Sequence, residues 1–148
     1  MEIKIKKLYE DSQIPTRGSE QAAGYDLYAH LEEGEAAFSL SPHQTTLVGT
    51  GIAVEIPEGY FGAVYARSGL ACKNDIRPEN CVGVIDSDYR GEIKVALHND
   101  NNMKTFMVEK DMRIAQLVIM PYLNVEFKEV EDLDDTDRGQ GGFGSTGA

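Results

Sequence analysis

The chain has 148 residues, of which 41% are hydrophobic, so it is long enough to form one domain around one ordinary core. Its formal net charge of −11 argues against a nucleic-acid-binding surface, which needs a basic patch. No apolar run approaches the length of a membrane span and the N-terminus lacks the apolar region of a signal peptide, so we expect a soluble, cytoplasmic protein without membrane partners.

The first half of the chain predicts a series of short strands separated by turns. Ile3 and Ile5 alternate with charged residues, as in a half-exposed strand over residues 1–8, whereas the polar residues 11–21 predict a loop. Apolar and aromatic content predicts five more strands, over residues 22–29, 35–40, 44–50, 52–56 and 60–66. The last of these strands runs into a short helical segment, residues 69–73.

Polar residues in the strand over residues 22–29 and at the start of the helical segment can each be explained in two ways. Asp26 lies among apolar neighbours, where an unpaired acid is costly to bury, or it faces outward on an edge strand. Arg67, Ser68 and the backbone of Gly69 precede or begin the helical segment, where N–H groups favour bound phosphate. The alternative there is an ordinary turn between a strand and a helix.

Residues 83–91 are the most informative stretch of the sequence. An apolar pair leads in as a buried strand and residues 92–97 lead out with strand alternation, so the pattern predicts a β-hairpin with a polar, glycine-bounded turn. Asp86, at the end of a rigid strand, is placed to hold and deprotonate a water, and Tyr89 to present its ring to a sugar or base. The alternative is a charged turn that keeps a sheet edge soluble.

The second half predicts three more strands, over residues 105–108, 113–120 and 124–130, and a loop over residues 75–80. Gln116 is polar within an apolar strand and needs hydrogen-bond partners, either as a core glutamine bonded to backbone or as a functional group. Because the strands are short and no segment shows helical periodicity over ten or more residues, we predict an all-β barrel or sandwich.

The composition changes after residue 130. Residues 131–148 are an acidic linker followed by a glycine-rich end, which composition alone predicts to be a flexible tail. Phe143, Arg138 and a Gly-Ser-Thr-Gly run indicate instead a tail that becomes ordered over a bound anion. We therefore divide the chain into a β-barrel domain over residues 1–130 and a linker with a C-terminal lid.

The cysteines and histidines do not predict a transition-metal site. Cys72 and Cys81 have the wrong spacing for a zinc knuckle and fit a reducing compartment, and the three histidines are scattered. Any metal is expected to be a hard cation bound by oxygen.

Five stretches together, in this order, resemble one family. They read A-G-Y-D-L-Y-A (23–29), R-S-G-L-A (67–71), G-V-I-D-S-D-Y-R-G (83–91), R-I-A-Q-L (113–117), and R-G followed by G-F-G-S-T-G (138–147). The family is that of the homotrimeric dUTP diphosphatases. The resemblance implies a distorted jelly-roll-like β-barrel with a flexible glycine-rich C-terminal arm, and hydrolysis of dUTP to dUMP and diphosphate with Mg²⁺. It also implies a homotrimer whose active sites are shared between chains, and a role in keeping uracil out of DNA and supplying dUMP for thymidylate synthesis.

The resemblance further implies a role for each site residue. Asp86 looks like the general base that orients the water attacking the α-phosphorus, and Tyr89 like the ring packed under the deoxyribose. Asn80 and the backbone around Gly83 match the groups that contact uracil. Asp26 resembles the acid that positions Mg²⁺-bound waters, while the substrate phosphates hold the cation.

The other matched residues bind the phosphates or cover the site. The phosphate contacts implied by the resemblance are Arg67, Ser68, Gly69 and Gln116. The residues of the implied lid are Phe143, which stacks on uracil, and Arg138, Gly144, Ser145 and Thr146, which close over the β- and γ-phosphates. Such closure expels water and positions the phosphates for in-line attack. We interpret Arg113 as structural and Arg90 as solvated.

Two other functions stay open. A dCTP deaminase shares the fold, but such enzymes lack the Phe-Gly-Ser-Thr tail and are usually longer. A non-catalytic interaction module gated by nucleotide is the second; the presence of Asp86, Tyr89 and the tail argues against it.

Overall fold

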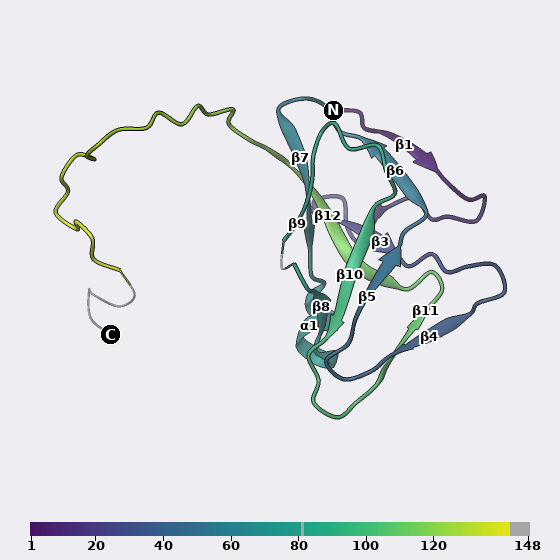
Figure 1. Cartoon of the computed structure of the whole chain (residues 1–148). Helices are drawn as coiled ribbons and strands as arrows, with labels where there is room; N and C mark the ends of the chain where they lie inside the picture. Colours follow the sequence, from purple (N-terminus) through teal and green to yellow (C-terminus); the bar gives the residue numbers. More distant parts are fainter. Residues whose placement is uncertain (81, 143–148) are drawn as a thin grey trace.

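The computed structural model describes residues 1–80 and 82–142 (Figure 1). It consists of short strands and one short helix, as predicted. The elements are β1 (Lys4–Lys7), β2 (Thr16–Arg17), β3 (Tyr25–Tyr28), β4 (Ala37–Leu40), β5 (Thr45–Gly49), β6 (Ile52–Glu55), β7 (Tyr60–Tyr65), α1 (Ser68–Asn74), β8 (Ile76–Pro78), β9 (Gly83–Ile85), β10 (Lys94–Asn99), β11 (Phe106–Glu109) and β12 (Arg113–Pro121). Within the described ranges, no helix is long and apolar enough to cross a membrane.

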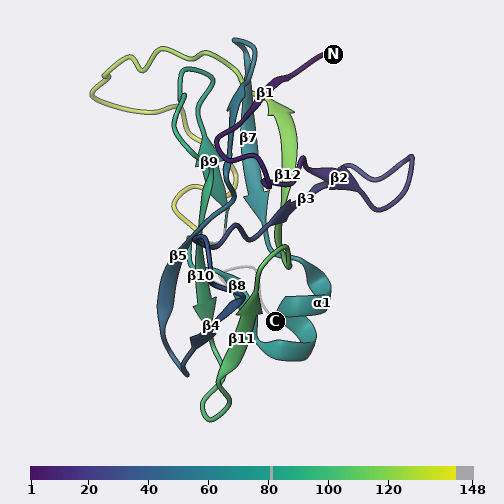
Figure 2. The same cartoon turned by 90° about the vertical axis from the view of Figure 1, so that its right-hand side faces the viewer.

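The strands pair in antiparallel sheets that pack into a jelly-roll-like all-β fold. The largest sheet has the order β2-β3-β12-β7-β9, and a three-stranded sheet has the order β5-β10-β8. Two further pairs, β1 with β6 and β4 with β11, complete the pairing seen in the described residues. Figure 2 shows β5 and β10 on one side of the molecule and β3 and β12 on the other.

Alternating burial along the strands builds a common core between the sheets. In β10, Val95, Leu97 and Asn99 are buried, because alternate residues of a strand point to opposite faces. The buried Asn99 is satisfied: its side-chain amide donates to Leu40 O and Lys104 O, both at 2.9 Å. The core therefore has a polar anchor that ties β10 to β4 without an unpaired group.

The two strands on either side of residues 86–91 do not form the predicted hairpin. β9 pairs with β7, with Ile85 opposite Gly62, whereas β10 pairs with β5 and β8. The sequence pattern shows that each arm buries one face, but it does not show which strand supplies the hydrogen bonds. The two strands were predicted correctly and their mutual pairing was wrong: the polar segment crosses between two sheets.

Three further elements differ from the prediction. β2 and β8 lie where loops were expected; β8 ends in Pro78 at the edge of its sheet, where a missing N–H is tolerated. The strand predicted over residues 124–130 is wrong for this chain. Residues 122–140 are all exposed and none of them lies in a strand, so alternating apolar residues alone did not make a strand there.

Candidate functional site

Three neighbouring strands bring together residues from separate parts of the sequence. β12 lies between β3 and β7, and Gln116 is opposite Asp26 on one side and Tyr65 on the other. β7 ends at Tyr65, and two residues later the chain reaches Arg67, which precedes α1. Asp26, Arg67 and Gln116 therefore meet at one end of the large sheet, as the sequence predicted.

Two arginines surround the carboxylate of Asp26. Arg67 Nε donates to Asp26 Oδ1 at 2.7 Å and Arg113 donates from a terminal guanidinium nitrogen to Oδ2 at 3.2 Å. Asp26 has a side chain only 14% exposed, so it is a largely buried, paired acid and not an outward-facing one. Two guanidinium groups around one carboxylate leave one positive charge in excess, which favours an anionic ligand.

The side chain of Gln116 forms a hydrogen bond to the backbone, which is one of the two alternatives predicted for it. Its side-chain nitrogen donates to Ala66 O at 2.8 Å. A Cβ at Gly24 would lie 2.3 Å from Gln116 Oε1, so the amide fits only because residue 24 has no side chain. This packing links the turn before α1 to β12 and keeps the amide oxygen beside β3.

Ser68 and Gly69 are exposed in the first turn of α1. Arg67, at the N-cap, has an extended backbone with φ −87° and ψ 126°, and its carbonyl accepts the first helical hydrogen bond from Ala71 N at 2.9 Å. Leu70 N donates to the same carbonyl at 3.0 Å, so the N–H groups of Ser68 and Gly69 are the ones in this turn that a helix leaves without an internal acceptor. They lie next to the two arginines and add donors for an anion.

A second group of predicted residues lies in the crossover from β9 to β10. Asp86 is exposed and follows β9 directly, and its carbonyl accepts from Tyr89 N at 3.2 Å. Asp86 lines a cavity of about 940 Å³ together with Phe61, Arg90 and Tyr122. The carboxylate is thus open to a ligand and anchored by a strand that ends in the core.

Tyr89 folds back over the glycine that ends this segment. Its hydroxyl donates to Glu92 O at 3.0 Å, and a Cβ at Gly91 would lie 2.5 Å from the ring carbon Cζ. Tyr89 as a whole residue is 47% exposed, so part of it stays available for a ligand. Arg90, predicted to be solvated, donates to Ser87 O at 2.6 Å and therefore stabilises the turn.

The two groups lie at opposite ends of β7. Because Ile85 is opposite Gly62, Asp86 is level with Phe61, whereas Arg67 follows six residues later. At about 3.3 Å per residue, an extended segment of that length spans about 20 Å. A general base must lie within hydrogen-bond reach of the attacking water. A single chain therefore does not bring Asp86 to an anion held by Arg67.

Asn80 and Gly83 lie close to one another at the start of β9. Gly83 is buried opposite Val64, and a Cβ there would be 3.1 Å from the side-chain nitrogen of Asn80. Asn80 itself is exposed. The side chain of Asn80 and the backbone of Gly83 thus lie side by side.

The tail is described only in part. Arg138 is exposed and donates from Nε to Gly141 O at 2.7 Å. Figure 1 shows residues 122–142 leading away from the strands. The other predicted lid residues, Phe143, Gly144, Ser145 and Thr146, lie outside the described residues.

The described residues do not gather a metal site of their own. Within these ranges no three His, Cys, Asp or Glu side chains lie together so as to hold a metal ion. Both carboxylate oxygens of Asp26 already accept from arginines. This donor set fits a cation bound mainly by ligand phosphates, with Asp26 reaching it through water.

Arg113 is a site residue that sequence reasoning did not assign to the site. In a regular strand, Arg113 and Gln116 point to opposite faces because they are an odd number of residues apart. The pairing of β12 with β3 shifts register between Arg113 and Ala115, and such a bulge re-aims the side chains that follow. Both side chains consequently lie on the side of Asp26. No signal in the sequence marks this bulge.

The comparisons with known proteins cover nearly the whole chain. The dUTPase family model matches residues 10–147. The deoxyuridine 5′-triphosphate nucleotidohydrolase of Nautilia profundicola is 49% identical over 147 residues, which cover 99% of each chain. Staphylococcus bacteriophage 80alpha dUTPase, solved with dUPNHPP, is similar with a TM-score of 0.87 and 31% identity over 99% of each chain. A mutant dUTPase of phage phi11 of S. aureus, described for its coordination of a structural Mg(II) ion, has a TM-score of 0.79 and 26% identity, over 91% of this chain and all of that one. The chain belongs to the dUTPase family.

Proposed function

We propose that this protein hydrolyses dUTP to dUMP and diphosphate in the cytoplasm, so that uracil is kept out of DNA and dUMP is available for thymidylate synthesis. Family membership over nearly the whole chain carries this proposal. The anion-binding cluster around Arg67 and the exposed carboxylate of Asp86 supply the two chemical requirements of the reaction, a phosphate site and a base.

Asp86 acts as the general base. It accepts a proton from a water molecule whose oxygen bonds to the α-phosphorus, and the bond from that phosphorus to the bridging oxygen breaks, releasing diphosphate. A base at the end of a strand is suited to this role because its position is fixed before the substrate binds. Asp86 follows β9, whose last residue is buried.

The cluster at the other end of β7 binds the phosphates. Arg67 donates charge-assisted hydrogen bonds, with Ser68, Gly69 and Gln116 as neutral partners. Mg²⁺, when bound to the phosphates, would neutralise part of their charge, and Asp26 would orient the water molecules of that ion. Arg113 holds the second oxygen of Asp26 and so keeps the carboxylate in position.

Selectivity arises from the segment between β8 and β10. The Tyr89 ring packs under the deoxyribose and crowds out a ribose 2′-hydroxyl. Asn80 and backbone groups at Gly83 pair with the uracil edge, leave no room for a 5-methyl group and mismatch cytosine. A site that leaves polar groups unpaired against the wrong base rejects it strongly.

We propose a homotrimer in which each site combines Asp86 of one chain with Arg67 of another. The separation along β7 supports this arrangement, because one chain alone leaves both groups without their counterpart. Leu123, Val125 and Phe127 support it as well: they alternate along residues 122–130, are exposed, and lie in no strand. An unpaired segment of this kind is suited to pairing with a neighbouring chain.

Residues 1–130 form the barrel domain in this proposal, and residues 131–148 form a linker and lid over a neighbouring site. Phe143 stacks on the uracil. The residues that close over the phosphates are Arg138, Gly144, Ser145 and Thr146. Closure of such a lid excludes water and positions the phosphate chain.

The test is release of diphosphate from dUTP, dTTP, dCTP and UTP in parallel, with and without Mg²⁺. We expect Mg²⁺-dependent turnover of dUTP only. Ammonia release from dCTP would instead identify a deaminase of the same fold. An absence of turnover for every nucleotide, with dUTP still bound, would identify a binding module.

A further inference from the structure

β5 lies at the edge of its sheet (Figure 2). It pairs with β10 on one side, and among the described residues no strand pairs with its other side. The free N–H and C=O groups of such an edge are a template for a further strand. Long open edges are usually covered or charged in native proteins, so the side chains around β5 determine what can approach it.

Hydrogen bonds just beyond β5 show which of its backbone groups are free. Thr50 N donates to Ile93 O at 3.1 Å, in line with β10, so the even-numbered residues here face β10. On the opposite side, Gly49 O accepts from His30 N at 2.9 Å, so the odd-numbered residues face outward. Leu47 therefore presents both its N–H and its C=O at the open edge, and its side chain is 62% exposed.

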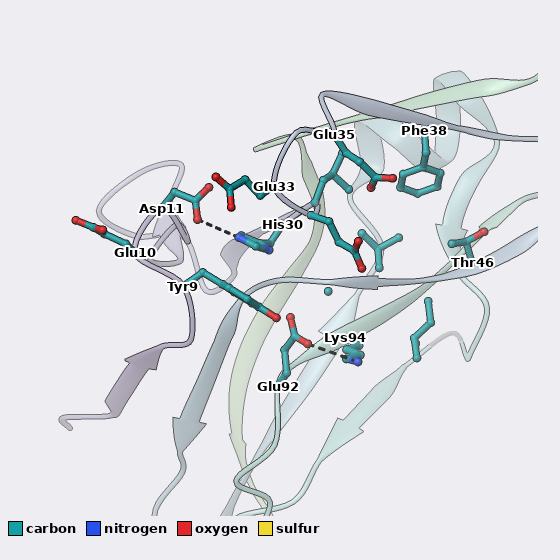
Figure 3. A pocket seen from close by; sticks show the side chains of 15 residues that line it. Tyr9, Glu10, Asp11, His30, Glu33, Glu35, Phe38, Thr46, Glu92 and Lys94 are labelled. Atoms are coloured by element: carbon teal, nitrogen blue, oxygen red, sulfur yellow. Dashed lines mark hydrogen bonds and ion pairs between the residues drawn. The ribbon is translucent and has the colours of Figure 1, made fainter.

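The open edge of β5 lines a groove of about 1080 Å³ (Figure 3). Residues 30–33, Glu35 and Phe38 of β4 line the same groove. Tyr9 closes part of it, with its ring stacked on His30 at a centroid distance of 4.2 Å. The volume slightly exceeds the usual range for ligand pockets, about 300–1,000 Å³. The groove is therefore large enough for a segment of peptide next to the free edge.

The charge of the groove indicates which kind of segment can bind there. Its lining contains one lysine, Lys94, and six carboxylates: Glu10, Asp11, Glu32, Glu33, Glu35 and Glu92. Asp11 pairs with Lys110 and Glu92 with Lys94, whereas the other four acids form no ion pair within residues 1–80 and 82–142. Such a surface attracts a basic partner.

We propose that this groove binds an extended, basic segment of a partner protein, which adds to β5 as a further strand. Backbone groups of the segment pair with Leu47, and alternate Lys or Arg side chains reach Glu33 and Glu35 on the acidic side of the groove. In an extended strand every second side chain points the same way, so one face carries all of these charges. None of the residues proposed for dUTP hydrolysis lines the groove, so this binding is separate from that activity.

The binding test uses fluorescence anisotropy with the full chain and a labelled peptide in which Lys or Arg alternates with Val. We expect saturable binding that weakens as salt is added. A matched peptide with Glu in place of each Lys or Arg is expected to bind at least about tenfold more weakly. A basic peptide N-methylated at alternate residues keeps its charge but loses the strand hydrogen bonds, and is expected to lose about tenfold in affinity.

Two variants of Leu47 separate backbone pairing from side-chain contact. Leu47→Pro removes an N–H that faces away from β10, and proline is tolerated at such edge positions. We expect this variant to lose at least about tenfold in peptide affinity, whereas Leu47→Ala, which keeps the N–H, binds like the unchanged chain. Glu33→Lys combined with Glu35→Lys is expected to weaken binding about tenfold at low salt. Turnover of dUTP is expected to be unchanged in all three.

Three results would overturn the proposal. The first is equal affinity for the basic and the N-methylated peptide; this comparison needs no variant and decides the matter if Leu47→Pro does not fold. The second is complete displacement of the peptide by spermine together with equal affinity of folded Leu47→Pro, which would make the groove a polyamine site. The third is a lower assembly mass for Leu47→Pro, which would make this edge an interface between copies.

Discussion

The separation of Asp86 from Arg67 along β7 leads to a prediction about mixed assemblies. The register of β9 on β7 puts about 20 Å of extended chain between the two residues. Each chain then supplies Asp86 to one site and Arg67 to another. Arg67→Ala and Asp86→Asn, each inactive when pure, are therefore expected to complement each other when mixed.

The fraction of activity that the mixture recovers equals the fraction of sites that receive both intact residues. A site in the mixture is intact only if its Asp86 comes from an Arg67→Ala chain and its Arg67 from an Asp86→Asn chain. With equal amounts and random assembly, each condition holds for one half of the chains, so about a quarter of the sites regain activity. Sites built within one chain would give none.

The assay is diphosphate release after the two variants are unfolded together and refolded as a mixture. The matched control mixes the unchanged chain with the double variant Arg67→Ala/Asp86→Asn. Shared sites predict about a quarter of full activity there as well, whereas sites within one chain predict about a half. If the mixture of single variants shows only background activity while its assembly keeps the mass of the unchanged protein, the idea of a site shared between chains is refuted.

Three further predictions concern single features. Asp86→Asn is expected to abolish turnover but to retain dUTP binding by calorimetry, because the amide is nearly isosteric and not basic; turnover like that of the unchanged chain would remove Asp86 from its role. Deleting residues 138–148 is expected to leave the circular dichroism spectrum and the mass of the assembly intact while turnover falls strongly, and unfolding would show that the tail is structural. The Lys110 ammonium, and then His30, lower the pKa of the Asp11 carboxyl from 3.8 to about 2, so the stability from this contact is present above about pH 4 and is lost as the pH falls toward 2. In urea titrations Asp11→Asn is expected to show a shallower loss of stability across that window, and parallel curves would contradict the pairing.

The fold was predictable where local patterning decides the structure. β10 and β12 follow from alternation and a long apolar run, and both form where they were expected. Partners of strands were not predictable in the same way: residues 83–91 were interpreted as a hairpin, yet each arm pairs with a distant strand. Pairing over a long sequence distance depends on the packing of the whole core, which a local pattern does not contain.

The candidate site likewise contains residues whose proximity was predictable from the sequence and residues whose proximity was not. Asp26, Arg67 and Gln116 were expected together and lie together, because β3, β7 and β12 are neighbours. Arg113 joins them through a register shift that leaves no mark in the sequence. Asp86 was expected in the same site, but within one chain it lies at the other end of β7.

The exposed apolar segment at residues 122–130 affects the tendency of an unassembled chain to aggregate. In a dilute chain Leu123, Val125 and Phe127 stay exposed, and a strand-like apolar segment of this kind also pairs with unrelated open edges. Glu126 lies between Val125 and Phe127, Lys128 follows Phe127, and charges at such positions hinder aggregation. Under our trimer proposal, stability rises with protein concentration, and a newly made chain has a limited time in which to find its copies.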